Sequence, residues 1–210
     1  MTGVFNIVIA GVGGQGVLMA SKVLAESALA SGMDVKQNEV HGMAQRGGSV
    51  ISFVRIGERV HSPVVMPGTT DLLISFEPLE ALRYVHYLKP GGMLVYNKVT
   101  INPSTVASGL AEYPSDVEER IARACADSHG VDALSIAKEA GNAKAVNMVM
   151  VGSVLSNLPL DSKVIEGVVK AISRGKGGDV NLKALAGGAA AGPRFGPRST
   201  VCIHRHGRFS

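Results

Sequence analysis

Cysteine is nearly absent from this sequence, which has only Cys125 and Cys202 among its 210 residues. Two cysteines cannot build a disulfide framework or a four-cysteine metal site. Such low usage is typical of proteins from reducing compartments, so we expect a cytoplasmic protein. We expect no metal site in this chain.

Aromatic residues and long apolar runs are also scarce. Aromatics make up 4% of the chain, there is no Trp, and no apolar run approaches the roughly 18 residues needed to cross a bilayer. The apolar stretch Val4 to Ala20 has no basic residue before it and is interrupted by glycines, so we interpret it as a strand and a turn rather than a signal peptide. We therefore expect no membrane association.

The excess of positive charge is confined to the end of the chain. Residues 175–210 contain six Lys or Arg and one acidic residue, which leaves 15 basic and 16 acidic residues in residues 1–174. The body of the chain is close to neutral and has no basic face with interleaved aromatics, so we expect no nucleic-acid partner.

Short β-branched segments alternate with amphipathic ones in the first half of the chain. Val4 to Ala10 ends abruptly at Gly11 and predicts a buried strand, and helical spacing follows from Gly14 until Gly32. Further strands are expected at 33–40, 49–56, 72–76 and 92–97, and a helix is expected at 78–88, between the last two strands. This alternation predicts an α/β fold, a Rossmann-like three-layer domain with a mainly parallel or mixed sheet.

The second half predicts helices over 115–128, 142–158 and 161–174, and a short strand over 131–134. We expect 1–174 to form a single α/β domain. Residues 175–210 are rich in Gly, Ala, Pro and Arg, a composition that favours a partly flexible tail unable to pack a core.

The sequence GVGGQG lies between the first expected strand and helix. It places Gly11, Gly13 and Gly16 in a GxGxxG frame, and Gly14 adds a further position without a Cβ. Backbone N–H groups and a helix N-terminus converge at such a turn and stabilise anions. The alternative is a tight turn that only lets the helix pack on the sheet.

A dinucleotide site also requires an acidic residue at the end of the second strand. Glu39 is the nearest candidate, but it lies late and beside Val40 and His41. An NAD site is therefore possible on sequence grounds without being favoured.

The segment HGMAQRGGS, residues 41–49, brings a histidine, an arginine and three glycines together before a strand. Such a loop can present Arg46 to a carboxylate or a phosphate, with Gly47 and Gly48 shaping the backbone. The alternative is a polar connection in which Arg46 pairs with a surface acid.

Other polar groups have simpler explanations. Cys202, His204 and His206 are spaced as C-x-H-x-H but fall in the expected tail. Glu77 and Glu80 stand at a helix start, where helix capping explains them. Lys144 near an apolar helix could face an anionic ligand or extend into solvent.

The ordered motifs GVGGQGVLMASKVLAESA, EVHGMAQRGGSV, DLLISFEPLEALR, GGMLVYN and GNAKAVNMVMVGSVL resemble the 2-oxoacid ferredoxin oxidoreductase gamma-subunit family. The resemblance extends to about residue 174, and VHGMAQRGG points to the indolepyruvate type. It implies a subunit of an enzyme that oxidatively decarboxylates aryl pyruvates to acyl-CoA.

Cofactors and partners also follow from the resemblance. Thiamine diphosphate and iron-sulfur clusters are expected on a large partner subunit, ferredoxin is reached through the complex, and coenzyme A is a co-substrate. The sequence has no thiamine signature, and two distant cysteines cannot ligate a cubane cluster, so this chain alone is expected to hold no cofactor. By motif matching the phosphate-facing turn is Gly11, Gly13, Gly14, Gln15 and Gly16, and the loop beside it contains His41, Gln45, Arg46, Gly47 and Gly48.

Two rival functions remain open at this point. One is a free-standing NAD(P)-binding dehydrogenase, for which His41 is the only attractive proton-transfer residue. The other is a purely structural assembly subunit with an empty turn. Neither catalytic residues nor the role of the basic tail can be assigned from the sequence.

Overall fold

The structure is a computed structural model that describes residues 3–42, 47–103, 106, 108–173 and 177–193. Its strands are β1 (Phe5–Val12), β2 (Asp34–His41), β3 (Ser49–Gly57), β4 (Thr70–Ser75), β5 (Leu88–Asn97) and β6 (Ser128–Val131). Its α-helices are α1 (Val17–Ala30), α2 (Pro78–Tyr84), α4 (Val117–Ala124), α5 (Ala133–Glu139), α6 (Val146–Ser153), α7 (Ser162–Ile172) and α8 (Gly177–Ala191). Short 3₁₀ turns are η1 (Val85–Tyr87), η2 (Ala143–Ala145) and η3 (Leu155–Asn157).

Six strands form one mixed sheet in the order β2-β3-β1-β4-β5-β6. β1 pairs in parallel with β4, β4 with β5, and β5 with β6, whereas β3 pairs antiparallel with both β1 and β2. Within this described sheet only β3 runs against the others. The expected α/β class and mainly parallel sheet are confirmed.

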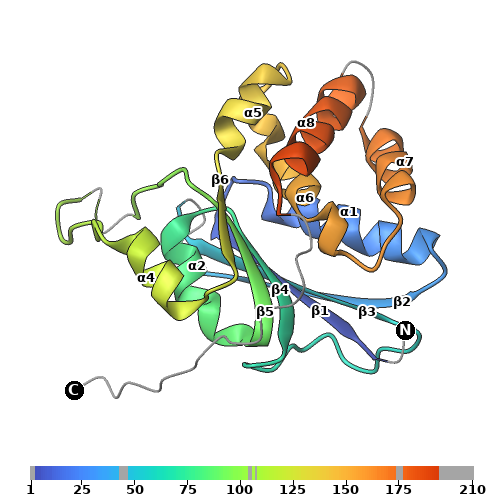
Figure 1. The fold of residues 1–210 in the computed structure, drawn as a ribbon, viewed down its shortest axis with the longest axis horizontal. Coiled ribbons are helices and arrows are strands. Elements are labelled where there is room, and N and C mark those ends of the chain that lie inside the picture. Colours follow the sequence, from blue (N-terminus) through green and yellow to red (C-terminus); the bar gives the residue numbers. More distant parts are fainter. Residues whose placement is uncertain (1–2, 43–46, 104–105, 107, 174–176, 194–210) are drawn as a thin grey trace.

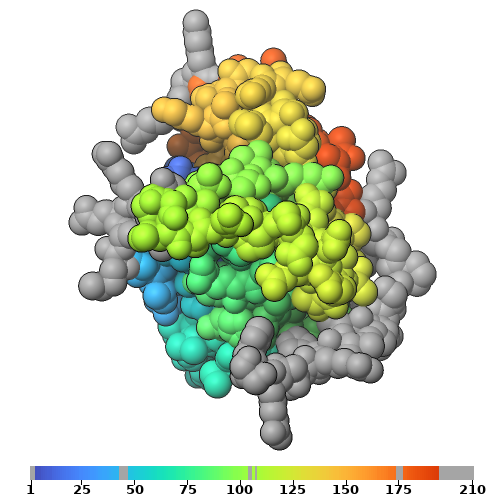
Figure 2. Space-filling view, turned by 90° about the vertical axis from the view of Figure 1, so that its left-hand side faces the viewer, coloured from blue at the N-terminus to red at the C-terminus, as the bar shows by residue number. Residues whose placement is uncertain are grey.

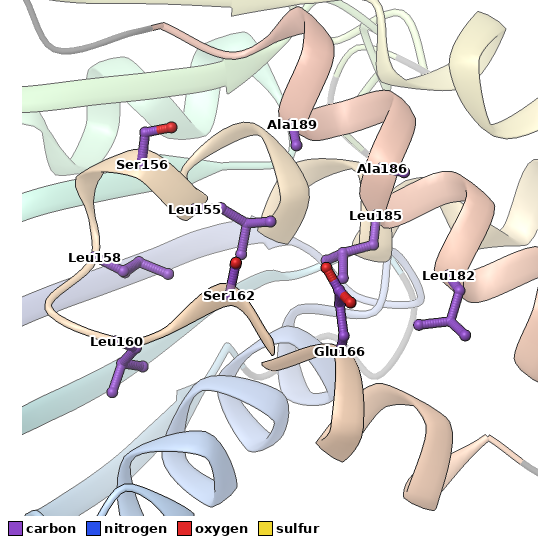
Figure 3. Close-up of a pocket in the computed structure, with 10 residues that line it drawn as sticks. All are labelled: Leu155, Ser156, Leu158, Leu160, Ser162, Glu166, Leu182, Leu185, Ala186 and Ala189. Carbon is purple, nitrogen blue, oxygen red and sulfur yellow. The ribbon is translucent and has the colours of Figure 1, made fainter. Parts of the chain in front are cut away.

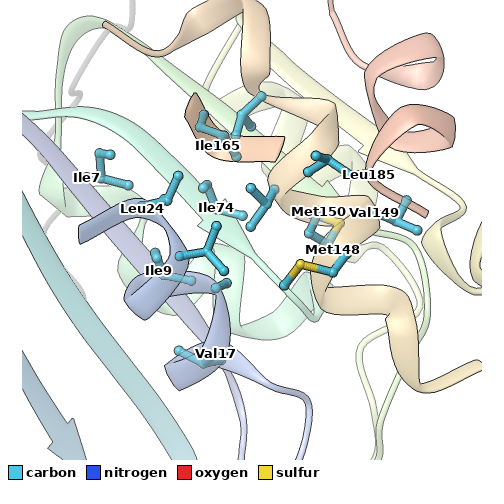
Figure 4. Packing of buried hydrophobic residues seen from close by; sticks show 14 of the residues in the cluster. Ile7, Ile9, Val17, Leu24, Ile74, Met148, Val149, Met150, Ile165 and Leu185 are labelled. Carbon is cyan, nitrogen blue, oxygen red and sulfur yellow. The ribbon is translucent and has the colours of Figure 1, made fainter. Parts of the chain in front are cut away.

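Helices cover both faces of the sheet and give three layers (Figure 1). On one face α1, α5, α6, α7 and α8 bury the apolar residues of alternate strand positions, and α2 and α4 bury the opposite positions. Figure 4 shows this first core, where Ile9 and Ile74 from the sheet lie among Leu24 of α1 and Met148 of α6. Each fully buried side chain of this size contributes about 1.5–3 kcal/mol to folding.

Two expectations for the second half of the chain are wrong. β6 occupies Ser128–Val131, so the strand expected over 131–134 is instead the end of β6 and the start of α5, whose N-cap Asp132 accepts a hydrogen bond from the N–H of Ser135. The long apolar helix expected over 142–158 is divided into η2, α6 and η3. Helix α7, by contrast, begins as expected after its cap Asp161.

Residues 177–191 also correct the expectation that the chain after Gly175 cannot pack a core. They form α8, in which Ala184 and Leu185 are fully buried in the same core as α6. Residues 194–210 of the expected tail, with Cys202, His204 and His206, lie outside the described residues.

Glycines explain how α8 packs so closely on α6. A Cβ built on Gly188 would lie 2.1 Å from the carbonyl oxygen of Val149, and a Cβ on Gly152 would lie 2.1 Å from that of Leu185. The backbones therefore approach to distances that no other residue permits. No helix in the described part of the chain has the length and apolar character needed to cross a membrane.

Candidate functional site

The glycine turn lies where β1 ends and α1 begins, at the carboxyl end of the parallel strands. Gly14 has φ +98° and Gly16 has φ +89°, a region that L side chains rarely adopt. At Gly11 an added Cβ would lie 2.8 Å from Val17 and 2.9 Å from Phe76. The turn therefore needs glycine for two reasons: backbone conformation at Gly14 and Gly16, and close packing at Gly11.

Three backbone amides of the turn already have partners inside the protein. The N–H of Val12 donates to Oε1 of Gln15 at 2.6 Å, and that of Gly13 to the carbonyl of Gly48 at 2.9 Å. The N–H of Gln15 donates to the carbonyl of Val12 at 3.1 Å. Among the described residues no partner is found for the N–H of Gly14 or Gly16, so the amides open to an anion are fewer than the GxGxxG frame suggested.

The side chain of Gln15 fastens the turn to the sheet. Its Nε2 donates to the carbonyl of Phe76 at 2.8 Å while its Oε1 accepts from Val12. Phe76 directly follows β4, so Gln15 joins the carboxyl ends of two neighbouring parallel strands. The structure thus gives Gln15 a bracing position in the turn.

Asn147 lies against the turn and was missed by sequence reasoning. Its side chain is half-buried at the start of α6, and a Cβ on Gly16 would lie 2.9 Å from its Nδ2. Its Oδ1 accepts from the N–H of Met148 at 2.9 Å, and its Nδ2 has no acceptor among the described residues. The motif GNAKAVNMVMVG contained this residue, but only the fold brings it beside Gly16.

The loop between β2 and β3 approaches the turn through Gly48, whose carbonyl accepts from Gly13. Gly47 has φ +71° with open space around it. His41 is exposed at the end of β2, which β3 separates from β1. Gln45 and Arg46 lie outside the described residues, so the structure brings Gly48 to the turn and leaves His41 two strands away.

The same strand order bears on the dinucleotide alternative. Glu39 lies on β2, and β3 stands between β2 and the strand that carries the turn. Neighbouring strands are about 4.8 Å apart, so Glu39 is displaced by about two strand spacings from β1. Its carboxylate accepts from Gln37 Nε2 at 2.9 Å. The acidic residue that a dinucleotide site needs beside the first strand is therefore not supplied by Glu39.

A buried carboxylate lies beside the turn, at the start of α2. Glu77 is 1% exposed and accepts from the N–H of Glu80 at 3.0 Å, which confirms the expected helix cap. It also accepts from the hydroxyl of Tyr113 at 2.6 Å. Burial, and then the Glu77 carboxylate, raises the pKa of Tyr113 above the ordinary tyrosine value.

The described residues between β5 and α4 lie over the carboxyl end of the parallel strands. In Figure 2 the yellow-green segment crosses the face between α2 and the α5–α6 region. Asn97 at the end of β5 donates to the carbonyl of Phe76 at 3.3 Å and accepts from the N–H of Ala133 at 3.3 Å. The carboxyl ends of β1, β4 and β5 are thus connected by amide side chains.

The other polar candidates form no second site in the described residues. Lys144 is exposed on η2, and its N–H donates to Oδ1 of Asn142 at 2.9 Å. No group of three or more His, Cys, Asp or Glu residues within the described ranges could hold a metal ion.

A separate apolar hollow of about 730 Å³ lies between α8 and the segment 155–166 (Figure 3). Among the described residues that line it, only Glu166 is ionisable. The remaining lining residues are apolar or small: Leu155, Ser156, Leu158, Leu160, Ser162, Leu182, Leu185, Ala186 and Ala189. None of the predicted site residues lines it, so the hollow and the glycine turn are different features.

Comparison with known sequences gives a consistent set of relatives. Residues 6–191 match the family described as pyruvate ferredoxin/flavodoxin oxidoreductase. The chain is 43% identical to the indolepyruvate oxidoreductase subunit IorB of Pyrococcus horikoshii, and 43% identical to that of Thermococcus kodakarensis. Each alignment covers 89% of this chain and 95% of the relative. The common gamma subunit of the pyruvate/ketoisovalerate oxidoreductases of Pyrococcus abyssi is 28% identical, over 83% of this chain and 89% of that subunit.

Solved structures share the fold at lower identity. Pyruvate oxidoreductase subunit PORC of Thermotoga maritima superposes with a TM-score of 0.68 at 24% identity and covers 90% of this chain and 96% of that one. The 2-oxoglutarate:ferredoxin oxidoreductase of Magnetococcus marinus, solved with 2-oxoglutarate, coenzyme A and succinyl-CoA bound, gives 0.69 at 17% identity. That match covers 96% of this chain but 33% of the longer polypeptide.

Proposed function

The chain belongs to the pyruvate ferredoxin/flavodoxin oxidoreductase family, and from this premise we propose that it is the small subunit of a heteromeric 2-oxoacid ferredoxin oxidoreductase. The complex converts indolepyruvate and related aryl pyruvates to acyl-CoA, with ferredoxin as electron acceptor. Thiamine diphosphate and iron-sulfur clusters reside on a large partner subunit, and the complex is cytoplasmic.

One observation carries the choice of substrate class. The chain is 43% identical to indolepyruvate oxidoreductase subunits over 95% of their length, against 28% for a subunit shared by pyruvate and ketoisovalerate enzymes. The relation extends over the whole fold and not over one motif, which favours the indolepyruvate type. A free-standing dehydrogenase is not supported, because Glu39 is displaced from the turn by β3.

The donors at the glycine turn that have no partner among the described residues suit a phosphate of coenzyme A. The N–H groups of Gly14 and Gly16 and the N-terminus of α1 would hold the anion, and Nδ2 of Asn147 stands against Gly16. Coenzyme A, when bound, supplies the thiol that accepts the acyl group. This chain would bind and orient the nucleotide end of that co-substrate.

Exposed apolar side chains lie at the same end of the sheet as the turn and would contact the large subunit. Leu18 and Met19 on the first turn of α1 are 41% and 42% exposed, and Val40 at the end of β2 is 50% exposed. Apolar side chains with a polar surround are typical of protein interfaces. We place the interface at this carboxyl end of the sheet.

Assembly provides the direct test of the proposed function. The chain should form a stable complex when co-expressed with a thiamine- and cluster-binding subunit, and that complex should reduce ferredoxin or a dye only with an aryl pyruvate and coenzyme A. The isolated chain should be inactive. Activity of the small chain alone, or equal rates with pyruvate, would refute the proposal.

Coenzyme A binding at the turn is tested by two isosteric variants in the assembled complex. Gly14 is exposed, with nothing within 4 Å of an added Cβ, so Gly14→Asn and Gly14→Asp are matched in size and backbone strain and differ in having an amide or a carboxylate. Calorimetry should show about tenfold weaker coenzyme A binding to the Asp variant than to the Asn variant, because the carboxylate repels the phosphate. Equal affinities would place the nucleotide elsewhere.

A further inference from the structure

We propose that Glu80 is a positioning residue that sets the glycine turn through Ser49 and Gly48. This inference rests on the proposed function of the turn. It concerns a carboxylate that helix capping does not explain, because Glu77 accepts the capping hydrogen bond at the start of α2.

Glu80 is a buried carboxyl group that the cap of its helix does not require. The residue is 4% exposed, although it stands in the first turn of a seven-residue helix. A carboxylate removed from water in this way must be paired or hydrogen-bonded. One oxygen accepts from Nε of Arg83 at 3.0 Å, and the other accepts from the hydroxyl of Ser49.

Ser49 belongs to the sheet, but its side chain is hydrogen-bonded to residues of α2. Its hydroxyl donates to Glu80, so the contact of 2.9 Å with Tyr84 has the tyrosine hydroxyl as donor. The chain of donors therefore runs from Tyr84 to Ser49 to Glu80. Since 31 residues separate Ser49 from Glu80, this contact is a tertiary one.

The backbone around Ser49 leads directly to the turn. Ser49 is the first residue of β3, where it stands opposite Val12 of β1, and its carbonyl accepts from the N–H of Gly42 at 2.9 Å. The preceding carbonyl, that of Gly48, accepts from the N–H of Gly13. Fixing Ser49 therefore fixes the acceptor that orients Gly13.

The turn is consequently held at two points, one by Phe76 directly after β4 and one by Glu80 in the first turn of α2. The carbonyl of Phe76 holds the Gln15 side chain, and Glu80 holds Gly13 through Ser49 and Gly48. With both anchors in place, the N–H groups of Gly14 and Gly16 have no partner among the described residues. Glu80 acts through other residues on the donors that would receive the phosphate.

Glycine amide signals in the full chain give a direct readout. In Glu80→Ala the amide resonances of Gly13 and Gly48 should shift, and exchange of the Gly13 N–H with solvent should accelerate about five- to tenfold, because its acceptor is less well fixed. Ser49→Ala should give the same shifts. Glu80→Gln keeps an oxygen for the Ser49 hydroxyl and should restore most of the wild-type spectrum.

Arg83→Gln serves as the matched control. It removes the other partner of the carboxylate and leaves the contact with Ser49, and the arginine side chain is 52% exposed. The glycine signals of this variant should match those of the wild type. If Arg83→Gln moves the Gly13 signal as much as Glu80→Ala does, Glu80 acts through α2 as a whole and the proposal is wrong.

The functional arm uses the assembled complex. Glu80→Ala should raise the KM for coenzyme A about five- to tenfold, with kcat at saturating coenzyme A unchanged and Glu80→Gln close to wild type. Shifted glycine signals without a change in this KM would contradict coenzyme A binding at the turn while leaving the positioning role intact. Unchanged signals in both Glu80→Ala and Ser49→Ala would overturn the positioning role itself.

Discussion

The side chain of Gln15 closes the gap between the ends of two parallel strands. Replacing it by Ala removes the acceptor of the Val12 N–H and one of two donors to the carbonyl of Phe76. We expect Gln15→Ala to lower the free energy of unfolding by about 1–3 kcal/mol, because a part-buried N–H loses its partner. Urea denaturation followed by circular dichroism measures this change.

Gln37→Ala is the control for that substitution. Gln37 is exposed on the edge strand β2, where its amide donates to Ser21 and Glu39. Its loss should cost less than about 1 kcal/mol, since water replaces the exposed bond to Glu39 and the Ser21 hydroxyl keeps its own bond to the carbonyl of Leu18. An equal loss in the free energy of unfolding from both substitutions would show that the link made by Gln15 between the strand ends stabilises the fold no more than the hydrogen bonds of Gln37.

Tyr113 gives the molecule a predictable response to alkaline pH. Its pKa is raised in the folded state by burial and by Glu77, so the unfolded chain loses this proton first. The stabilising contribution is complete below the unfolded value of about 10 and is lost as pH rises through the folded value. The free energy of unfolding should fall less between pH 9 and about 11 in Tyr113→Phe than in the wild type.

This comparison is made by urea denaturation at both pH values. The pKa of Tyr96 is also raised, by burial and Glu118, so a part of the alkaline loss should persist in Tyr113→Phe. Tyr96→Phe should remove a further part. A wild-type slope that neither substitution reduces would contradict the assignment.

At the scale of elements, local sequence patterns predicted those helices, strands and turns that depend on neighbouring residues alone. The strand, turn and helix around GVGGQG follow from periodicity and glycine, although β1 continues through Gly11 to Val12 and α1 begins only at Val17. The order of strands did not follow, because placing β3 between β2 and β1 depends on contacts between distant segments.

Helix α8 shows why composition misled the prediction for 177–191. Glycine and alanine bury little apolar surface, and a segment rich in them is typical of a tail. Against α6 the same small residues permit backbone contact that larger side chains would prevent. Only the partner helix makes the segment favourable, and no local pattern reveals the partner.

The candidate site divides in the same way. The glycine turn was predictable from spacing, whereas Asn147 and Glu80 reach it only through tertiary contacts. Glu80 was even assigned to helix capping, because three-residue spacing from Glu77 is typical of a helix start. Both carboxylates are buried, and only their partners separate the two roles: Glu77 accepts from the N–H of Glu80, and Glu80 accepts from the hydroxyl of Ser49. Such a tertiary partner is not visible in a single sequence.

Two glycine-to-alanine substitutions test the packing of helices α6 and α8. Gly188→Ala forces a Cβ to within 2.1 Å of the Val149 carbonyl, and we expect a loss of about 1–3 kcal/mol or more in the free energy of unfolding. Gly167→Ala, on α7, has nothing within 4 Å of the new Cβ and should stabilise by about 0.5–1 kcal/mol. Thermal and urea denaturation distinguish the signs, and stabilisation by both would contradict the described helix contact.

At the scale of the whole molecule, the proposed interface can be located with two exposed residues on one helix. Met19→Asp, on the first turn of α1, should weaken assembly with the large subunit about tenfold, because it places a charge in an apolar contact. Leu29 is 59% exposed on the last turn of the same helix, and Leu29→Asp should change affinity by less than about twofold. Titration of labelled variants into the large subunit measures both, and the reverse order would place the interface at the other end.

The late position of α8 in the chain also shapes its biosynthesis. During translation α6 leaves the ribosome before α8, the helix that covers it. Met148 and Val149 therefore cannot pack against Leu185 until residues 177–191 have been synthesised. Until then the nascent chain presents an uncovered apolar ridge of the kind that chaperones capture. One layer of the molecule therefore matures only after nearly all the described residues have been translated.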